Sequence, residues 1–366
     1  MGKQHRERIY LKSHISLATS NLPVLGRIIT LLHLVPAVLC GCSDAEHPAY
    51  EEIRREIGIA LTKSQDVKGP LDIFVFKDDR MQKLDCYLHL GDFSMWKGGV
   101  VTGSGDRIIT FITGIQKKKD DWTGITSRAA LEKVIVNLED ESPEAVVMSG
   151  ETGVRGAVDY TGVYGEGRPE ANIELSPVSS QICLERLSCD FTGRPYSDKS
   201  ISNVKVYLTN VNASCGILAS GKISPIRIIN QGRLSEEDMA GFKDKSLVYH
   251  HVTDPVEKEG RWTPIDFLCY PNNAPEESPG TPFTRLVIEG RVDGKTFYWP
   301  VDINRNASDG TDSEEQGICR GRRYTFDITI TGKGVSDPDT PVSSEYIDIN
   351  FKIKEWEEKE DCVILF

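Results

Sequence analysis

Residues 284–303 read TRLVIEGRVDGKTFYWPVDI. Two runs rich in β-branched and aromatic residues flank the dipeptide Asp293-Gly294. Runs of this composition form β-strands, and Asp-Gly accommodates the positive φ angles of a two-residue hairpin turn. The stretch therefore predicts a β-hairpin.

Four more segments have the same composition and predict further strands. They are residues 71–77, 203–211, 324–330 and 346–356. In the last segment, apolar residues at every second position predict one buried face and one solvated face. These apolar positions are Ile347, Ile349, Phe351 and Ile353.

Helical signals are confined to residues 127–140 and 234–243, where Ser127 and Ser235 are placed to cap short helices. Elsewhere Gly, Pro, Asn and Asp recur at intervals of about ten residues, a spacing typical of β-sandwiches. We therefore predict a mainly β fold with a few short helices.

The chain has 366 residues, which is long enough for two domains. Pro177 separates two strand-like runs and marks the predicted boundary. We predict an N-terminal β-sandwich domain at residues 69–177 and a C-terminal β-sandwich domain at residues 178–366.

The segment at residues 28–48, IITLLHLVPAVLCGCSDAEHP, is the main apolar run near the N-terminus. Fourteen residues separate Arg27 from Cys42, whereas a membrane-spanning helix needs roughly 20 apolar residues. The run follows a basic region, an order typical of a secretory signal peptide. We therefore predict that residues 1–41 form a signal peptide that is removed.

The apolar run ends in Leu39-Cys40-Gly41-Cys42, which resembles a bacterial lipobox. Cleavage after the small residue Gly41 would leave Cys42 at the new N-terminus, where acyl chains such as palmitate are attached. Two or more acyl chains on one protein together make a stable membrane anchor. Residues 42–68 are then a lipidated leader with a first strand, and a plain signal peptide without lipidation is the alternative.

Composition and motifs argue against several classes of function. The sequence has no HExxH, GxSxG, Walker or Rossmann glycine pattern. The seven cysteines after Cys42 include no CxxC pair, which argues against a zinc site, and the net charge of −12 argues against nucleic acid as a partner. We predict a non-enzymatic protein without metal or cofactor. The sequence leaves an outer-membrane enzyme open as an alternative.

Five segments spread over the chain point to one family. They are GPLDIFVFKDDRMQKLDCY from Gly69, PEAVVMSGE from Pro143, NVKVYLTNVN from Asn203, FLCYPNNAPEESPGTPFTRLVIEGRVDGKTFYWPVDI from Phe267 and RRYTFDITITGKGVSDPD from Arg322. In this order, and together with the lipobox, they resemble the fimbrillin superfamily of Bacteroidales. The resemblance is to the anchor and accessory lipoprotein subunits of type V pili, and it covers most of residues 42–366.

The resemblance implies two transthyretin-like β-sandwich domains in tandem, a lipid anchor in the outer membrane, surface exposure, and assembly with other fimbrial subunits by β-strand complementation. In that family an arginine- or lysine-directed protease trims stalk and tip precursors near the N-terminus and so opens a groove for a neighbour's strand, whereas anchor subunits keep their lipid. Arg54, Arg55 and Lys63 are the candidate processing residues, beside or within the strand-like run IGIAL. Ordinary solvated charges are the alternative interpretation of these residues.

The chain ends in the uncharged run Cys362-Val363-Ile364-Leu365-Phe366, whereas most chain ends are polar and frayed. An apolar terminal strand needs a cover. Residues Val363 to Phe366 are therefore predicted either to close their own domain or to be donated to a neighbouring pilin, and both interpretations stay open.

The resulting prediction is a fimbrial subunit. The alternative is a surface lipoprotein that binds a glycan or host ligand as an adhesin without polymerising. A ligand groove of that kind would gather aromatic side chains, and the tryptophans are scattered along the chain. They are Trp96, Trp122, Trp262, Trp299 and Trp356.

Overall fold

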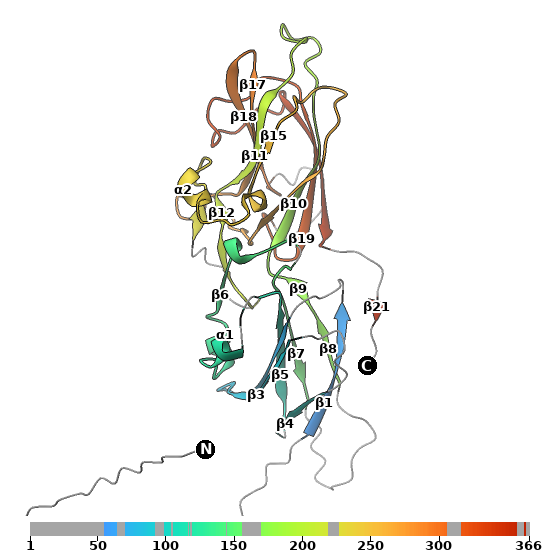
Figure 1. Ribbon diagram of the computed structural model, residues 1–366, viewed down its shortest axis with the longest axis vertical. Helices are drawn as coiled ribbons and strands as arrows, with labels where there is room; N and C mark the ends of the chain where they lie inside the picture. Colours follow the sequence, from blue (N-terminus) through green and yellow to red (C-terminus); the bar gives the residue numbers. More distant parts are fainter. Residues whose placement is uncertain are drawn as a thin grey trace, which may run out of the picture. The chain divides into compact units, whose positions relative to one another are not determined.

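The computed structural model describes residues 55–63, 70–91, 99–103, 105–115, 117, 119–143, 145–155, 170–218, 227–305, 316–356 and 362–363. Within these ranges the ordered elements are mostly β-strands, joined by short helical turns (Figure 1). The predicted mainly β sandwich fold is confirmed.

The N-terminal half contains two main sheets. One has five strands in the order β3-β2-β5-β7-β9. Their bounds are β2 Leu71–Lys77, β3 Leu84–Leu90, β5 Arg107–Thr113, β7 Met148–Val154 and β9 Ser176–Pro177. The other sheet is made by β1 Arg55–Lys63, β4 Gly99–Thr102, β8 Glu170–Glu174 and β21 Cys362–Val363.

Strand β2 is buried on both faces, which explains its nearly continuous apolar sequence. Alternate residues of a strand point to opposite faces. Leu71 and Ile73 join the core shared with β1, whereas Phe74 and Phe76 join a second core that extends into the C-terminal half.

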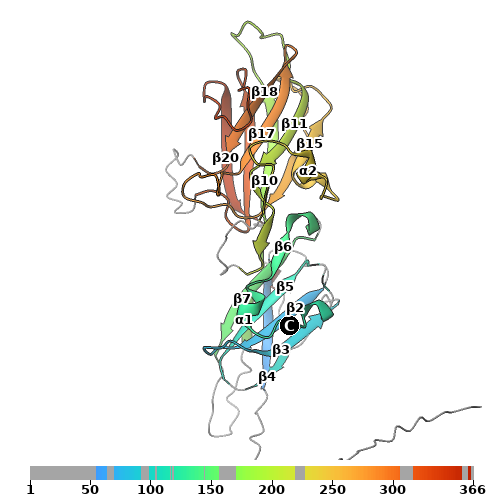
Figure 2. The same cartoon turned by 90° about the vertical axis from the view of Figure 1, so that its left-hand side faces the viewer.

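The C-terminal half is a sandwich of two four-stranded sheets, with orders β16-β10-β19-β20 and β15-β11-β17-β18 (Figure 2). The first sheet consists of β10 Ser180–Cys189, β16 Ile265–Cys269, β19 Arg322–Ile330 and β20 Ile347–Glu355. The second consists of β11 Ser202–Thr209, β15 Tyr249–Val252, β17 Arg285–Val292 and β18 Lys295–Asp302. Large aromatic side chains such as Phe267, Trp299 and Phe326 are buried in this half.

The predicted hairpin joins β17 and β18, which pair from Arg285↔Asp302 to Val292↔Lys295. Asp293 and Gly294 form the turn with φ angles of 54° and 76°. Positive φ at both central residues is the requirement of a type I′ turn, so the sequence signal and the backbone agree.

The two predicted helices are present but shorter than expected. Ser127 caps α1 (Arg128–Leu131) and Ser235 caps α2 (Glu236–Met239). The predicted helix over residues 127–140 is wrong beyond Leu131, because β6 (Ile135–Asn137) pairs with β13 (Ser214–Gly216). Pairing across the fold outweighs local helical spacing here. The remaining short elements are β12 Val211–Asn212, β14 Ile228–Ile229 and 3₁₀ turns at Lys119–Trp122, Leu138–Asp140 and Lys245–Leu247.

Polar groups from the two halves meet in a buried cluster around Glu141. Its carboxylate accepts hydrogen bonds from the Val147 amide at 3.0 Å and from the Tyr270 hydroxyl at 3.1 Å. Nearby, the Arg320 guanidinium donates to Ser149 Oγ at 2.7 Å. The hydrophobic core also contains residues from both sides of Pro177. The domain boundary predicted at Pro177 therefore stays a prediction.

Burial raises the pKa of Glu141 to about 7, against the hydrogen bonds that favour its ionised form. An acid whose pKa is raised by folding stabilises the fold below its unfolded pKa and loses that contribution as the pH rises to the folded pKa.

Wild-type stability should therefore fall by about 3 kcal/mol between pH 4 and pH 8 relative to Glu141→Gln. Urea unfolding across this range measures the difference. The exposed control Glu276→Gln should follow the wild type, and parallel curves for Glu141→Gln and wild type would contradict the assignment.

Candidate functional site

Strand β1 is hydrogen-bonded along both edges, although it is the first strand of the chain. It pairs antiparallel with β4 from Arg55↔Thr102 to Gly58↔Gly99. It pairs parallel with β8 from Gly58↔Glu170 to Thr62↔Glu174. Without β1, both β4 and β8 would lose backbone partners.

Strand β1 also completes an apolar core. Ile57 is 4% exposed and opposes Val100 of β4. Together with residues of β8 it covers the inner face of the five-stranded sheet. This core contains Ile57, Leu71, Ile73, Val75, Val100, Ile109, Phe111, Met148, Val154, Ala171, Ile173 and Leu175. Removing β1 would expose one side of it.

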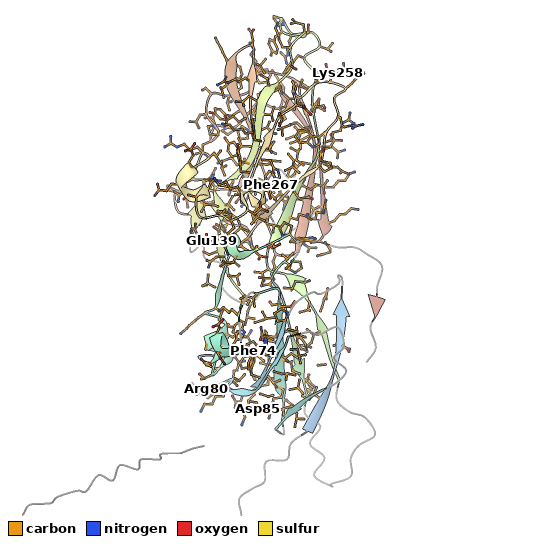
Figure 3. All side chains as sticks on the ribbon, in the orientation of Figure 1. Phe74, Arg80, Asp85, Glu139, Lys258 and Phe267 are labelled. Carbon is orange, nitrogen blue, oxygen red and sulfur yellow. The ribbon has the colours of Figure 1, made fainter. Side chains whose placement is uncertain are left out.

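Asp85 holds strand β4, one of the two neighbours of β1, at the strand's last residue, Thr102 (Figure 3). The Asp85 carboxylate accepts hydrogen bonds from Thr102 Oγ1 at 2.7 Å, the Gly103 amide at 2.9 Å and Arg107 Nε at 2.9 Å. Burial opposes ionisation of Asp85, yet these donors hold its pKa below the usual value. The hydrogen bonds to Asp85 therefore hold the end of β4 without any contribution from β1.

The candidate processing residues differ in their relation to this strand. Arg55 is the first residue of β1 and Lys63 is its last. Arg54 and the predicted lipid site Cys42 lie outside the described residues. A cut after Lys63 would separate all of β1 from the body, whereas a cut after Arg55 would leave nearly all of it attached.

The C-terminal run also reaches this sheet. Cys362 and Val363 pair antiparallel with Lys63 and Thr62 at the end of β1. Ile364, Leu365 and Phe366 lie outside the described residues, so the role of Val363–Phe366 as a closing or donated strand stays a prediction.

This site is built from backbone pairing and apolar contact. Among the described side chains, His, Cys, Asp and Glu form no group of three that is placed to hold a metal. No helix within the described ranges combines the length and apolar character needed to cross a membrane. The arrangement is a strand held between two others by backbone pairing and apolar packing.

No protein-family model matches the sequence. Solved structures do share its fold. A candidate cell adhesion protein from Bacteroides eggerthii DSM 20697 has a TM-score of 0.60 at 17% identity, covering 84% of this chain and 96% of its own. A fimbrilin from Porphyromonas gingivalis W83 has a TM-score of 0.56 at 13% identity, covering 82% and 98%. A candidate cell adhesion protein from Parabacteroides distasonis ATCC 8503 has a TM-score of 0.55 at 14% identity, covering 83% and 100%.

The fold is fimbrilin-like. The match extends over nearly all of the solved fimbrilin chain, so the likeness covers both halves of the structure and not a single sandwich. The resemblance proposed from the sequence is thereby supported at the level of fold.

The sequence predicts β8, one of the two strands that flank β1, but not β4, the other. One of the two strand-like runs that flank Pro177 covers residues 171–175 and overlaps β8. Strand β4 was missed because it has only four residues, two of them the valines Val100 and Val101. Two adjacent β-branched residues were the only available signal, and such a short run does not distinguish a strand from a loop.

The core contact of β1 can be tested by mutation. Ile57→Ala should lower the free energy of unfolding by about 2–5 kcal/mol, because it opens a cavity in a filled core. Val101→Ala is the matched control, since Val101 lies on the partner strand and is 50% exposed, and it should change stability by less than about 0.5 kcal/mol. Denaturant unfolding measures both variants. Equal effects would show that β1 does not contribute Ile57 to the core.

Proposed function

We propose that this chain is a structural subunit of a cell-surface fimbria, in an anchor or accessory/tip position, and that it joins neighbouring subunits by exchange of a β-strand. The placement of β1 is the observation that supports this most. It lies between β4 and β8, fills an apolar groove with Ile57, and ends at Lys63. The fimbrilin-like fold supports the same conclusion.

Exchange is favoured by the physics of sheet edges. Loss of β1 would leave unpaired backbone donors and acceptors on β4 and β8 beside an open apolar groove. An extended strand from a neighbour would satisfy those groups along its length, and its apolar side chains would refill the groove. A subunit with β1 in place is closed to such a strand, so removal of β1 controls assembly.

Among the processing candidates we favour Lys63. Cleavage there releases the whole of β1, while cleavage after Arg54 or Arg55 does not. Cleavage after Lys63 also separates the body from Cys42. A subunit that accepts a strand at this groove therefore loses its lipid tether, and a subunit that serves as the anchor keeps β1.

Limited digestion tests the role of Lys63. Cleavage of the wild-type chain after Lys63 should release β1 and produce oligomers, measured by light scattering after gel filtration. Lys68 offers the same protease a second cut between β1 and β2, so it is changed to Gln in every chain compared. In that background Lys63→Gln should stay monomeric under a lysine-directed protease, and Arg55→Gln, at the other end of β1, should behave as the chain with Lys63 intact. Oligomers from Lys63→Gln, or a chain cut after Lys63 that remains monomeric, would contradict the proposal.

We also propose that Cys42 carries the lipid and that the body is displayed at the outer-membrane surface. Twelve residues lie between Cys42 and Arg55. An extended chain of that length spans about 40 Å, enough to hold the sandwich clear of the lipid headgroups.

Intact-mass analysis of the membrane-extracted chain tests the lipid site. The wild-type chain should begin at an acylated Cys42. Cys42→Ser should lose the acyl mass because the sulfur that forms the thioether is gone, while the neighbouring control Cys40→Ser should keep it. Acylation that survives in Cys42→Ser would contradict the assignment.

The adhesin alternative receives less support from the aromatic residues. Trp122, Trp299 and Trp356 are buried in the cores. Trp262 is partly buried, and its indole N–H donates to the Leu184 carbonyl at 3.1 Å. These four described tryptophans do not form an exposed platform for a sugar ring.

A further inference from the structure

A short segment of the N-terminal half, residues 134–141, packs on the C-terminal half, and we call it the strap. Its strand β6 (Figure 1) pairs antiparallel with β13. Next to this pairing, the Leu138 amide donates to the Ala213 carbonyl at 2.9 Å, and Glu139 forms an ion pair with Arg227. The strap therefore joins the two halves through backbone and side-chain contacts.

Glu141 is the last residue of the strap, and its carboxylate bridges the two halves. One oxygen, Oε2, accepts a hydrogen bond from the Val147 amide at 3.0 Å, within the N-terminal half. The other oxygen, Oε1, accepts a hydrogen bond from the Tyr270 hydroxyl at 3.1 Å, from the C-terminal half. Glu141 is 6% exposed, so both bonds are shielded from solvent. Loss of the bond to Tyr270 would free the end of the strap from the C-terminal half.

A cation lies near this carboxylate without pairing with it. Arg320 attracts the ionised form of Glu141. The guanidinium of Arg320, however, donates to Ser149 Oγ at 2.7 Å and to the Ile217 carbonyl at 3.1 Å. In the described part of the chain no ion pair joins Arg320 to Glu141. Attraction without direct contact does not offset the cost of burying a charge.

The other titratable groups around Glu141 supply no positive charge. Asp140, its neighbour on the strap, disfavours ionisation. Cys215 and Tyr270 interact with it from the C-terminal half, and both stay uncharged at neutral pH because burial raises their pKa values. Burial is also the main influence on Glu141 and raises its pKa to about 7. A negative charge at Glu141 therefore forms near neutral pH at a site that is shielded from solvent.

From these contacts we propose that Glu141 is a pH-sensitive contact between the two halves, closed when its carboxyl group is protonated and open when it is ionised. The protonated group keeps the end of the strap against Tyr270. The ionised group is unfavourable in the buried position, so the strap separates and the carboxylate is hydrated. Separation of β6 from β13 then exposes Cys215, which lies opposite Val136. The inference stands apart from the fimbrial function, because it involves this chain alone.

Two natural cysteines report on the opening. Cys215 is 6% exposed and lies in the strand that pairs with the strap, whereas Cys269 is 0% exposed in the core and reacts only after global unfolding. The purified full-length chain would be treated with iodoacetamide at pH 6 and pH 8, and the labelling of each cysteine would be followed by peptide mass spectrometry. Each rate is divided by the rate of the same cysteine in the urea-unfolded chain at the same pH, which corrects for ionisation of the thiol.

The proposal predicts that the corrected rate of Cys215 rises about tenfold from pH 6 to pH 8. This factor follows from a carboxyl group whose pKa is about 7 in the closed form and has its ordinary value in the open form. At both pH values Cys215 should react many times faster than Cys269, because the opening is local. Equal rates of Cys215 at the two pH values would overturn the proposal. Equal corrected rates of the two cysteines would also overturn it, because the exposure would then be global unfolding.

Variants of the strap connect the pH dependence to Glu141. Glu141→Gln cannot ionise, so its corrected Cys215 rate should be the same at pH 6 and pH 8, while the exposed control Glu276→Gln should keep the rise. Asp140→Asn retains Glu141 and removes the neighbouring negative charge, so the rate should level off at a lower pH. This second variant keeps the test decisive if Glu141→Gln folds poorly. A rise that persists in Glu141→Gln, or a profile that Asp140→Asn leaves unchanged, would overturn the proposal.

Discussion

The backbone hydrogen bonds that β1 makes along both of its edges are the interaction on which the N-terminal half depends. They join segments that are far apart in the chain, since β4 lies about residue 100 and β8 about residue 172. The apolar core behind them is closed only while a strand occupies that place. This dependence on one strand is the basis of our proposal that a strand of similar pattern from a neighbouring subunit takes the position.

The C-terminal sandwich is organised differently, and the difference suits a division of roles. Its best-defined unit is the β17–β18 hairpin, which the short Asp293-Gly294 turn holds together locally. Arg285, which is 5% exposed, adds ion pairs to Asp302, Glu277 and Asp339. We interpret this half as a scaffold and propose the N-terminal half as the place of strand exchange.

Sequence reasoning anticipated the parts of the fold that are encoded locally. The strand at residues 71–77 and the hairpin turn followed from composition, period and glycine conformation. The helix expected through residue 140 failed because β6 is a strand only by virtue of its pairing with β13, about 80 residues away. The same limit applies to the site: the run containing Ile57 and the run that overlaps β8 are visible in the sequence, but their pairing with each other and the four-residue strand β4 are not.

If β1 is a replaceable strand, as we propose, hydrogen exchange should detect both its loss and its return. The experiment uses a chain that has been cut after Lys63 and freed of the cut segment, with and without a synthetic peptide of residues 55–63. Amide protection in β4 and β8 should fall when the segment is removed and return when the peptide is added. Protection that is unchanged by removal, or that the peptide does not restore, would contradict the proposal.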